Sequence, residues 1–103
     1  MIMDLEMAAM GLVGNAGESR SLSFEALKFA KNGEFEKAEE LLNEAKKYSL
    51  MAHEVQTELI CKEADGNKVE LGLLMVHAQD HLMTSILARE LIHELIEIYK
   101  IKK

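Results

Sequence analysis

The stretch VHAQDHLMTS carries two histidines and an aspartate within five positions: His77, Asp80 and His81. Asp80 is the only formally charged residue between Glu70 and Arg89, so these side chains interrupt an otherwise apolar run. Imidazole and carboxylate groups bind metal ions and carry protons or phosphoryl groups. This stretch is therefore the strongest candidate for a functional site.

His77 and His81 are four residues apart and share one helix face, just beside the apolar seam on which Asp80 falls. Three interpretations fit this spacing. The two imidazoles could hold one metal ion. One of them could attack phosphorus and hold the phosphoryl group as a labile phosphoramidate, because a neutral imidazole is available near pH 7. They could also be two half-buried structural histidines, hydrogen-bonded to their neighbours.

Asp80 lies on a seam of apolar residues three or four positions apart: Leu73, Val76, Met83 and Leu87. Burying an ionised carboxylate alone costs more free energy than a small domain can lose. Asp80 must therefore meet a cation, stay protonated, face a polar interior or lie at the exposed edge of the fold. If copies of the chain met at a symmetry axis along this seam, their Asp80 side chains would converge there and attract a metal ion or a proton.

Other polar residues are weaker candidates. Glu90 and His93 form a single Glu-x-x-His, whereas a di-iron helical bundle needs a second copy and further inward-facing glutamates. His53 is one imidazole on a predicted helix, a setting more typical of a structural residue. Cys61 has no Cys-x-x-Cys context, and we expect it to be a small packed residue. The glycines of GLVGNAG are not followed by a Lys-Ser/Thr pair, so they predict no phosphate-binding loop.

Composition narrows the class of protein. The chain has 103 residues, of which 49% are hydrophobic and 5% aromatic, with no Trp and no Pro, which favours one domain (1–103) with a helix-packing core. The net charge of −6 argues against nucleic-acid binding, which needs Lys and Arg to neutralise phosphates. One cysteine fits a reducing cytoplasm, and no apolar stretch reaches the roughly 18 residues of a membrane span. Asp4 and Glu6 stand where a signal peptide needs positive charge. We expect a cytoplasmic protein that does not insert into a membrane.

Helical periodicity predicts three helices, at about 2–31, 34–63 and 69–101. The seam of small residues in the first segment keeps its register across the glycines of GLVGNAG, which favours one continuous helix. Asn32-Gly33 and the ADGNK stretch at 64–68 predict the two breaks. Because both connections are short, the expected fold is all-α, an antiparallel up-and-down three-helix bundle.

The third predicted helix is apolar on two faces. Its second seam follows Leu71, Met75, Ala78, Leu82 and Ile86, beside the seam that carries Asp80. A helix that is apolar nearly all round must be buried nearly all round. Two other helices of one chain cannot cover it, so we expect a further partner from another copy of the chain.

The sequence MVHAQDHLMTSILARELIHELIEIYK closely resembles the last helix of the lactose/cellobiose-type enzyme IIA of the bacterial sugar phosphotransferase system. Three further segments are similar to the same family, in order along the chain: GNAGESRS, EALKFAKNGEFEKAEELL and AHEVQTELI. The resemblance implies a three-helix bundle assembled as a homotrimer. It also implies a phosphotransferase that relays a phosphoryl group between proteins during uptake of lactose, cellobiose, chitobiose or a related β-glucoside.

The resemblance also implies residue roles. His77 matches the family's phosphorylated histidine, which takes the phosphoryl group from phospho-HPr and passes it to a cysteine of enzyme IIB. Asp80 matches the aspartate that gathers at the threefold axis and binds a divalent metal ion, expected to be Mg²⁺, and no organic cofactor is implied. Gln79 and His81 complete the motif and are expected in the active-site groove.

Two other classes of protein stay open on the residues alone. A non-enzymatic helical scaffold would have the same periodicity, but it gives no reason for His77, Asp80 and His81 to stand together. A metal-storage or di-iron protein would explain the histidines and carboxylates, but the chain lacks the paired ligand motif.

Overall fold

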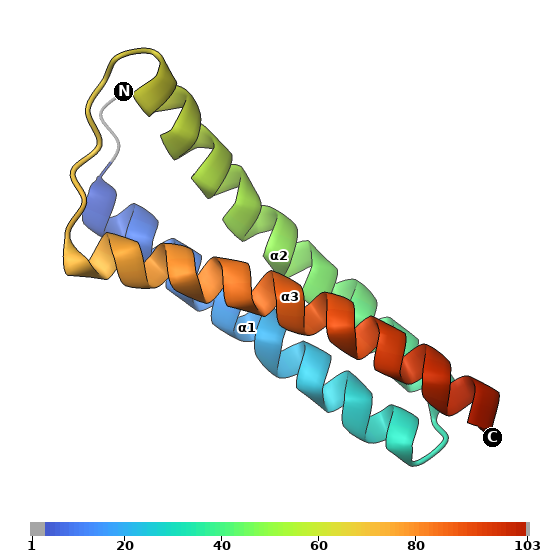
Figure 1. Ribbon diagram of the computed structural model, residues 1–103. Helices are drawn as coiled ribbons and strands as arrows, with labels where there is room; N and C mark the ends of the chain where they lie inside the picture. Colours follow the sequence, from blue (N-terminus) through green and yellow to red (C-terminus); the bar gives the residue numbers. More distant parts are fainter. Residues whose placement is uncertain (1–3, 103) are drawn as a thin grey trace.

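Three long α-helices make up nearly all of residues 4–102, the part of the chain that the computed structural model describes. They are α1 (Leu5–Lys31), α2 (Phe35–Ala64) and α3 (Leu73–Lys102). Consecutive helices run in opposite directions, so α1 and α3 are parallel (Figure 1). Together they form a rod of 53 × 22 × 20 Å. The predicted all-α, up-and-down three-helix bundle is confirmed.

Local sequence explains where α1 begins and where α1 and α2 end. The Asp4 carboxylate accepts hydrogen bonds from the backbone N–H groups of Glu6 and Met7, as an N-cap does. α1 is followed by Gly33 at φ 80° and α2 by Gly66 at φ 91°, a conformation that glycine adopts without strain. In both places the N–H groups of the glycine and of the next residue bond back to the last helical turn, which is a Schellman motif. Both predicted breaks are therefore confirmed.

The first helix is continuous through all three of its glycines, as the small-residue seam predicted. Its eight buried residues are Ala9, Leu12, Ala16, Ser19, Leu22, Ser23, Ala26 and Ala30. Small side chains on this face let neighbouring helices approach closely. The prediction placed the start of this helix at residue 2; residues 2 and 3 lie outside the described residues.

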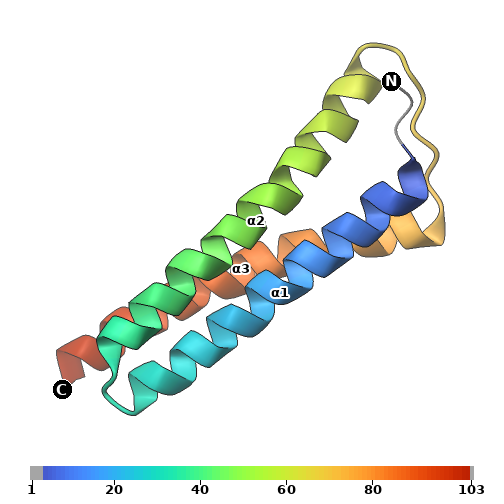
Figure 2. The same ribbon diagram turned by 180° about the vertical axis from the view of Figure 1, so that it is seen from behind.

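α1 is the helix against which the other two pack. α2 and α3 both lie along it, whereas they have much less contact with each other. Figures 1 and 2 show α2 separating from the other two helices toward its C-terminal end. The core accordingly forms two clusters along the rod, one around Leu12 and Leu82 and the other around Leu22 and Ile96. The first cluster lies beside the candidate site and gives α3 a fixed support there.

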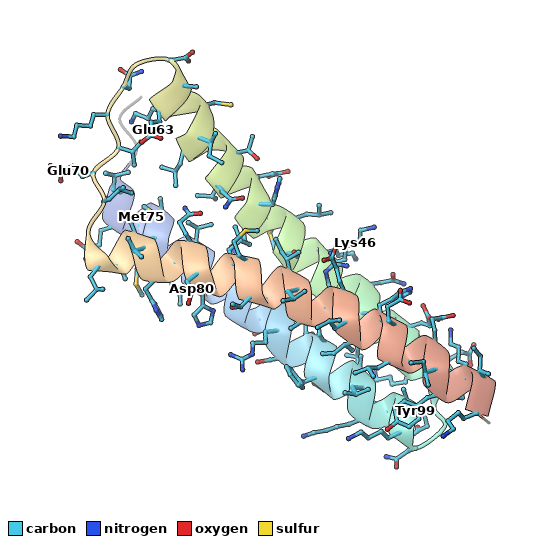
Figure 3. All side chains as sticks on the ribbon, viewed as in Figure 1. Lys46, Glu63, Glu70, Met75, Asp80 and Tyr99 are labelled. Carbon is cyan, nitrogen blue, oxygen red and sulfur yellow. The ribbon has the colours of Figure 1, made fainter. Side chains whose placement is uncertain are left out.

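The third helix starts later than predicted. It begins at Leu73 rather than at about 69, and its first backbone hydrogen bond joins the N–H of Val76 to the carbonyl of Gly72. The connection, residues 65–72, has to cross from the diverging end of α2, near Glu63, past Glu70 to α3 (Figure 3). An extended residue spans about 3.3 Å, against 1.5 Å in a helix, so the chain stays extended there. Leu71, predicted on the second seam of this helix, precedes α3 and is 74% exposed.

A polar contact joins α2 and α3 at the opposite end of the rod. The Lys100 ammonium donates to Glu39 Oε1 at 2.6 Å and to Glu97 Oε2 at 3.1 Å. The hydrogen bond to Glu39 is the main cause that raises the pKa of Lys100 above its ordinary value, and the hydrogen bond to Glu97 is the next largest. The two helices are thus tied at this end and diverge toward the other.

Candidate functional site

In the single chain, one of the two apolar seams of α3 is buried and the other is exposed. The seam of Met75, Ala78 and Leu82 is buried against the rest of the bundle. The seam that carries Asp80 is bare: Leu73 is 87% exposed, and Val76, Met83 and Leu87 are 52–55% exposed. Large exposed apolar side chains continue along α3 at Leu91, Leu95, Ile98 and Ile101. We call this exposed row, from Leu73 to Ile101 with Asp80 inside it, the α3 stripe.

Asp80 lies in the N-terminal half of α3 and is exposed (Figure 3). Its carboxylate has no hydrogen-bond or ion-pair partner among the described residues. Thr84 donates its hydroxyl proton to the backbone carbonyl of Asp80 at 2.9 Å and leaves the carboxylate free. In the single chain, Asp80 is therefore an exposed carboxylate within an apolar row.

His77 and His81 lie together on the side of the α3 stripe that faces α1. Their ring centroids are 5.2 Å apart in an edge-to-face arrangement, with an interplanar angle of 74°. His77 is exposed, and His81 is half-buried with a buried Nδ1 that has no hydrogen-bond partner among residues 4–102. The interpretation as two half-buried, hydrogen-bonded histidines does not fit, since His77 is an accessible imidazole.

A groove between α1 and α3 runs beside His81. From α1 it is lined by Gly17, Arg20, Ser21 and Phe24, among others. The Arg20 guanidinium lies over the Phe24 ring, 5.8 Å from its centroid. An arginine in this position offers a planar set of donors that suits a phosphoryl group or a carboxylate.

Gln79 faces the other way, toward α2. Its side-chain oxygen Oε1 accepts a hydrogen bond of 2.8 Å from Gln56 Nε2, and its own Nε2 lies 3.7 Å from the sulfur of Met75. On an α-helix, with about 100° per residue, His77 lies about 60° to one side of Asp80 and Gln79 about 100° to the other. Within one chain the structure therefore brings His77 and His81 together and keeps Gln79 apart from them.

The remaining polar candidates form no metal site in a single chain. Glu90, His93 and Glu94 line a hollow between α2 and α3 with Glu39. Within residues 4–102, however, no three His, Cys, Asp or Glu side chains lie close enough together to hold a metal ion. His53 is exposed on α2, with its Nδ1 3.5 Å from the Thr57 hydroxyl.

Cys61 is exposed, so the prediction of a packed cysteine is wrong. It lies two positions after the buried Leu59, which turns it away from the bundle. The helix register alone would have placed Cys61 correctly on the exposed face of α2.

Two residues of the site region were missed from the sequence. Arg20 comes from α1 and Gln56 from α2, about 60 and 20 positions away from the motif, so no local spacing links them to it. For Arg20 the available signal was its place, less than one turn after the last helical glycine, Gly17, on a helix that must pack against the motif. For Gln56 no signal was available, because its partner depends on how far α2 diverges from α3.

Comparison with known proteins identifies the family. The family model for "PTS system, Lactose/Cellobiose specific IIA subunit" matches residues 7–100. The chain is 50% identical over 97 residues to the PTS system N,N'-diacetylchitobiose-specific EIIA component of Escherichia coli K12, covering 94% of this chain and 84% of the relative.

Solved structures agree in fold. The PTS cellobiose-specific enzyme IIA from Bacillus anthracis superposes with a TM-score of 0.92 at 45% identity, covering 97% of this chain and 92% of that one. The IIA subunit in the IIA(Chitobiose)–HPr complex of the Escherichia coli phosphotransferase system gives 0.84 at 48% identity, covering 99% and 100%.

In the described part of the chain, none of the helices has the length and apolar content needed to cross a membrane. The family match spans all three helices, and the relatives and solved structures cover more than nine tenths of the chain. The chain therefore belongs to the lactose/cellobiose-specific IIA subunits of the phosphotransferase system, which are phosphoryl-transfer components of sugar uptake.

Proposed function

We propose that this chain is a phosphoryl carrier in which His77 accepts a phosphoryl group from phospho-HPr and passes it to a cysteine of the cognate enzyme IIB. The observation that carries the proposal is the exposed His77 imidazole, in ring contact with His81 at the rim of an apolar surface. The solved complex of a related chitobiose IIA subunit with HPr supports HPr as the donor. The sugar belongs to the lactose, cellobiose and chitobiose group or to the related β-glucosides.

The chemistry is an in-line displacement at phosphorus. A lone pair on a His77 ring nitrogen attacks phosphorus, and the bond between phosphorus and its donor atom on HPr breaks, leaving its electron pair on HPr. In the second step the thiolate of enzyme IIB attacks, and the P–N bond returns its pair to His77. The residues around His77 have to position the two partners and avoid stabilising the phosphohistidine too strongly.

The bare α3 stripe supports a homotrimer as the working form. An apolar row that follows one helix for eight turns is larger than the surface that monomers usually expose. Parallel copies of α3 packed along this row would cover it on every chain at once, and they would bring the Asp80 carboxylates together at the axis. Each of these carboxylates is otherwise alone in an apolar surface.

The same packing would complete the phosphorylation site. His77 and Gln79 lie on opposite sides of the α3 stripe, about 160° apart around the helix. Around a threefold axis, the His77 side of one copy faces the Gln79 side of the next copy. The site would then combine His77 and His81 of one chain with Gln79 of its neighbour, which reconciles the expected role of Gln79 with its position in the single chain.

A divalent metal ion at the axis fits the donor set. One Asp80 alone is no metal site, and three converging carboxylates would repel one another unless a cation or a proton lay between them. Carboxylate oxygens are the ligands that Mg²⁺ and Ca²⁺ prefer. Such an ion would neutralise the Asp80 charge inside the apolar contact, and it takes no part in the transfer at His77.

Phosphorylation identifies the acceptor residue. Wild-type protein incubated with phosphoenolpyruvate, enzyme I and HPr should gain the mass of one acid-labile phosphoryl group per chain. His77→Ala should gain none, because it has no nucleophile at this position. His53→Ala, which removes another exposed histidine, should gain the same group as wild type. Intact mass spectrometry makes the measurement, and full labelling of His77→Ala would overturn the assignment.

Assembly along the α3 stripe is tested by one added charge. Wild type should have a mass of three times 11.6 kDa in light scattering. Leu87→Asp should fall to the monomer mass at micromolar concentration, because it places an unpaired carboxylate in the apolar contact. Met51→Asp, at an exposed methionine of α2, should stay trimeric. A monomeric wild-type protein would exclude this assembly.

Metal content tests the role of Asp80. After gel filtration in Mg²⁺, wild type should retain one ion per three chains, and Asp80→Asn should retain none. In chelator the order of stability should reverse: Asp80→Asn should unfold several degrees above wild type, since it removes the repulsion between carboxylates. Glu90→Gln, a control on the same helix, should behave as wild type. Equal metal content in wild type and Asp80→Asn would rule out the axial site.

A further inference from the structure

The two glutamines form a bridge across the groove between α2 and α3. Gln56 Nε2 donates to Gln79 Oε1 at 2.8 Å, in the half of the molecule where α2 diverges from α3. A hollow of about 170 Å³, lined in part by Gln79, lies on one side of the bridge, and a hollow of about 360 Å³, lined in part by Gln56, lies on the other. The bridge is therefore a polar contact between two open stretches of the groove.

The surroundings of the bridge fix the direction of both amides. Gln56 Nε2 lies 3.7 Å from the sulfur of Met83, and Gln79 Nε2 lies 3.7 Å from the sulfur of Met75. A thioether sulfur is a weak acceptor, so it accommodates an NH₂ group and would repel a carbonyl oxygen. Turning both amides over would set two oxygens against two sulfurs. The hydrogen bond therefore runs from Gln56 to Gln79 and not in reverse.

This direction decides which part of Gln79 is free. Its oxygen is occupied by Gln56, and its NH₂ group has only the weak contact to Met75, so Gln79 presents a hydrogen-bond donor. Without a partner the terminal amide would rotate, because the last torsion of glutamine has broad minima. A phosphoryl group carries acceptor oxygens only, and a fixed donor aimed at them stabilises the charge that develops during transfer.

The geometry points to Gln56 as a positioning residue of the phosphoryl-transfer site: it holds the Gln79 amide with the NH₂ group toward the phosphoryl group on His77 of the neighbouring copy. This inference rests on the proposed function and assembly. Gln56 itself touches neither the phosphoryl group nor His77, and it acts through the orientation of Gln79. Gln56 contributes by fixing which of the two amides is the donor in their shared hydrogen bond.

Two substitutions of Gln56 distinguish the effect of reversing the hydrogen bond to Gln79 from the effect of removing it. Gln56→Leu removes the hydrogen bond and leaves the Gln79 amide free to rotate. Gln56→Glu offers only an acceptor, so Gln79 has to turn over and donate to it, which leaves its oxygen toward the phosphoryl group. Thr57→Glu is the matched control, because it adds the same charge at the next position of α2, on an exposed residue that does not contact Gln79.

The rate of transfer from saturating phospho-HPr to each trimeric variant, measured by quenched flow, is the first readout. We expect Gln56→Glu to be at least about tenfold slower than Gln56→Leu, and Gln56→Leu to be slower than wild type, at unchanged half-saturation by HPr. Thr57→Glu should keep the wild-type rate. Rates for Gln56→Glu that equal those of Gln56→Leu or Thr57→Glu would overturn the inference. If Gln56→Glu does not assemble, a wild-type rate in Gln56→Leu overturns it.

The side-chain amide signals of Gln79 in ¹⁵N NMR spectra are the second readout, and they do not depend on phosphorylation. In Gln56→Glu both the proton and nitrogen signals should shift, because the NH₂ group now donates to a carboxylate, whereas Thr57→Glu should leave them in place. Unchanged signals in Gln56→Glu would also overturn the inference. Failure of the proposed function is distinct from both results, since it would appear as a wild-type protein that takes up no phosphoryl group.

Discussion

The burial of α3 is the constraint on which the rest of the molecule depends. α1 covers one apolar face of this helix with small side chains, and α2 lies too far from it along half of its length to cover a second face. An apolar row from Leu73 to Ile101 is left bare. The hydrophobic effect favours covering such a surface, and a second and third copy of the same helix are the simplest cover.

The polar residues of the site occupy distinct positions relative to that row. Asp80 lies inside it, His77 and His81 lie on its α1 side, and Gln79 lies on its α2 side. In one chain the two histidines and Gln79 lie on opposite sides of this row. In a symmetric assembly each boundary between copies joins one histidine pair with one glutamine, so association and formation of the site would be the same event.

Much of this fold could be predicted from the sequence, because helix periodicity and glycine breaks are local signals. The register of small residues gave α1 as one helix, and Gly33 and Gly66 marked the turns. The predicted start of α3 was too early. The residues before Leu73 stay extended because α2 diverges from α3, and this divergence is a tertiary property that the local sequence does not encode. The opposite orientations of His77 and Gln79 follow from helix geometry, but the Gln56 partner required the positions of two helices.

Mixed trimers test most directly whether the site is shared between copies. His77→Ala chains keep Gln79 and cannot be phosphorylated, and Gln79→Ala chains keep His77 but deprive their neighbours of the donor. The two variants, unfolded and refolded together, should form trimers in which some His77 residues regain a neighbouring Gln79. The account predicts that the phosphorylation rate per His77 rises above that of Gln79→Ala alone, toward the wild-type rate. An unchanged rate in trimers shown to be mixed would contradict a site built from two copies.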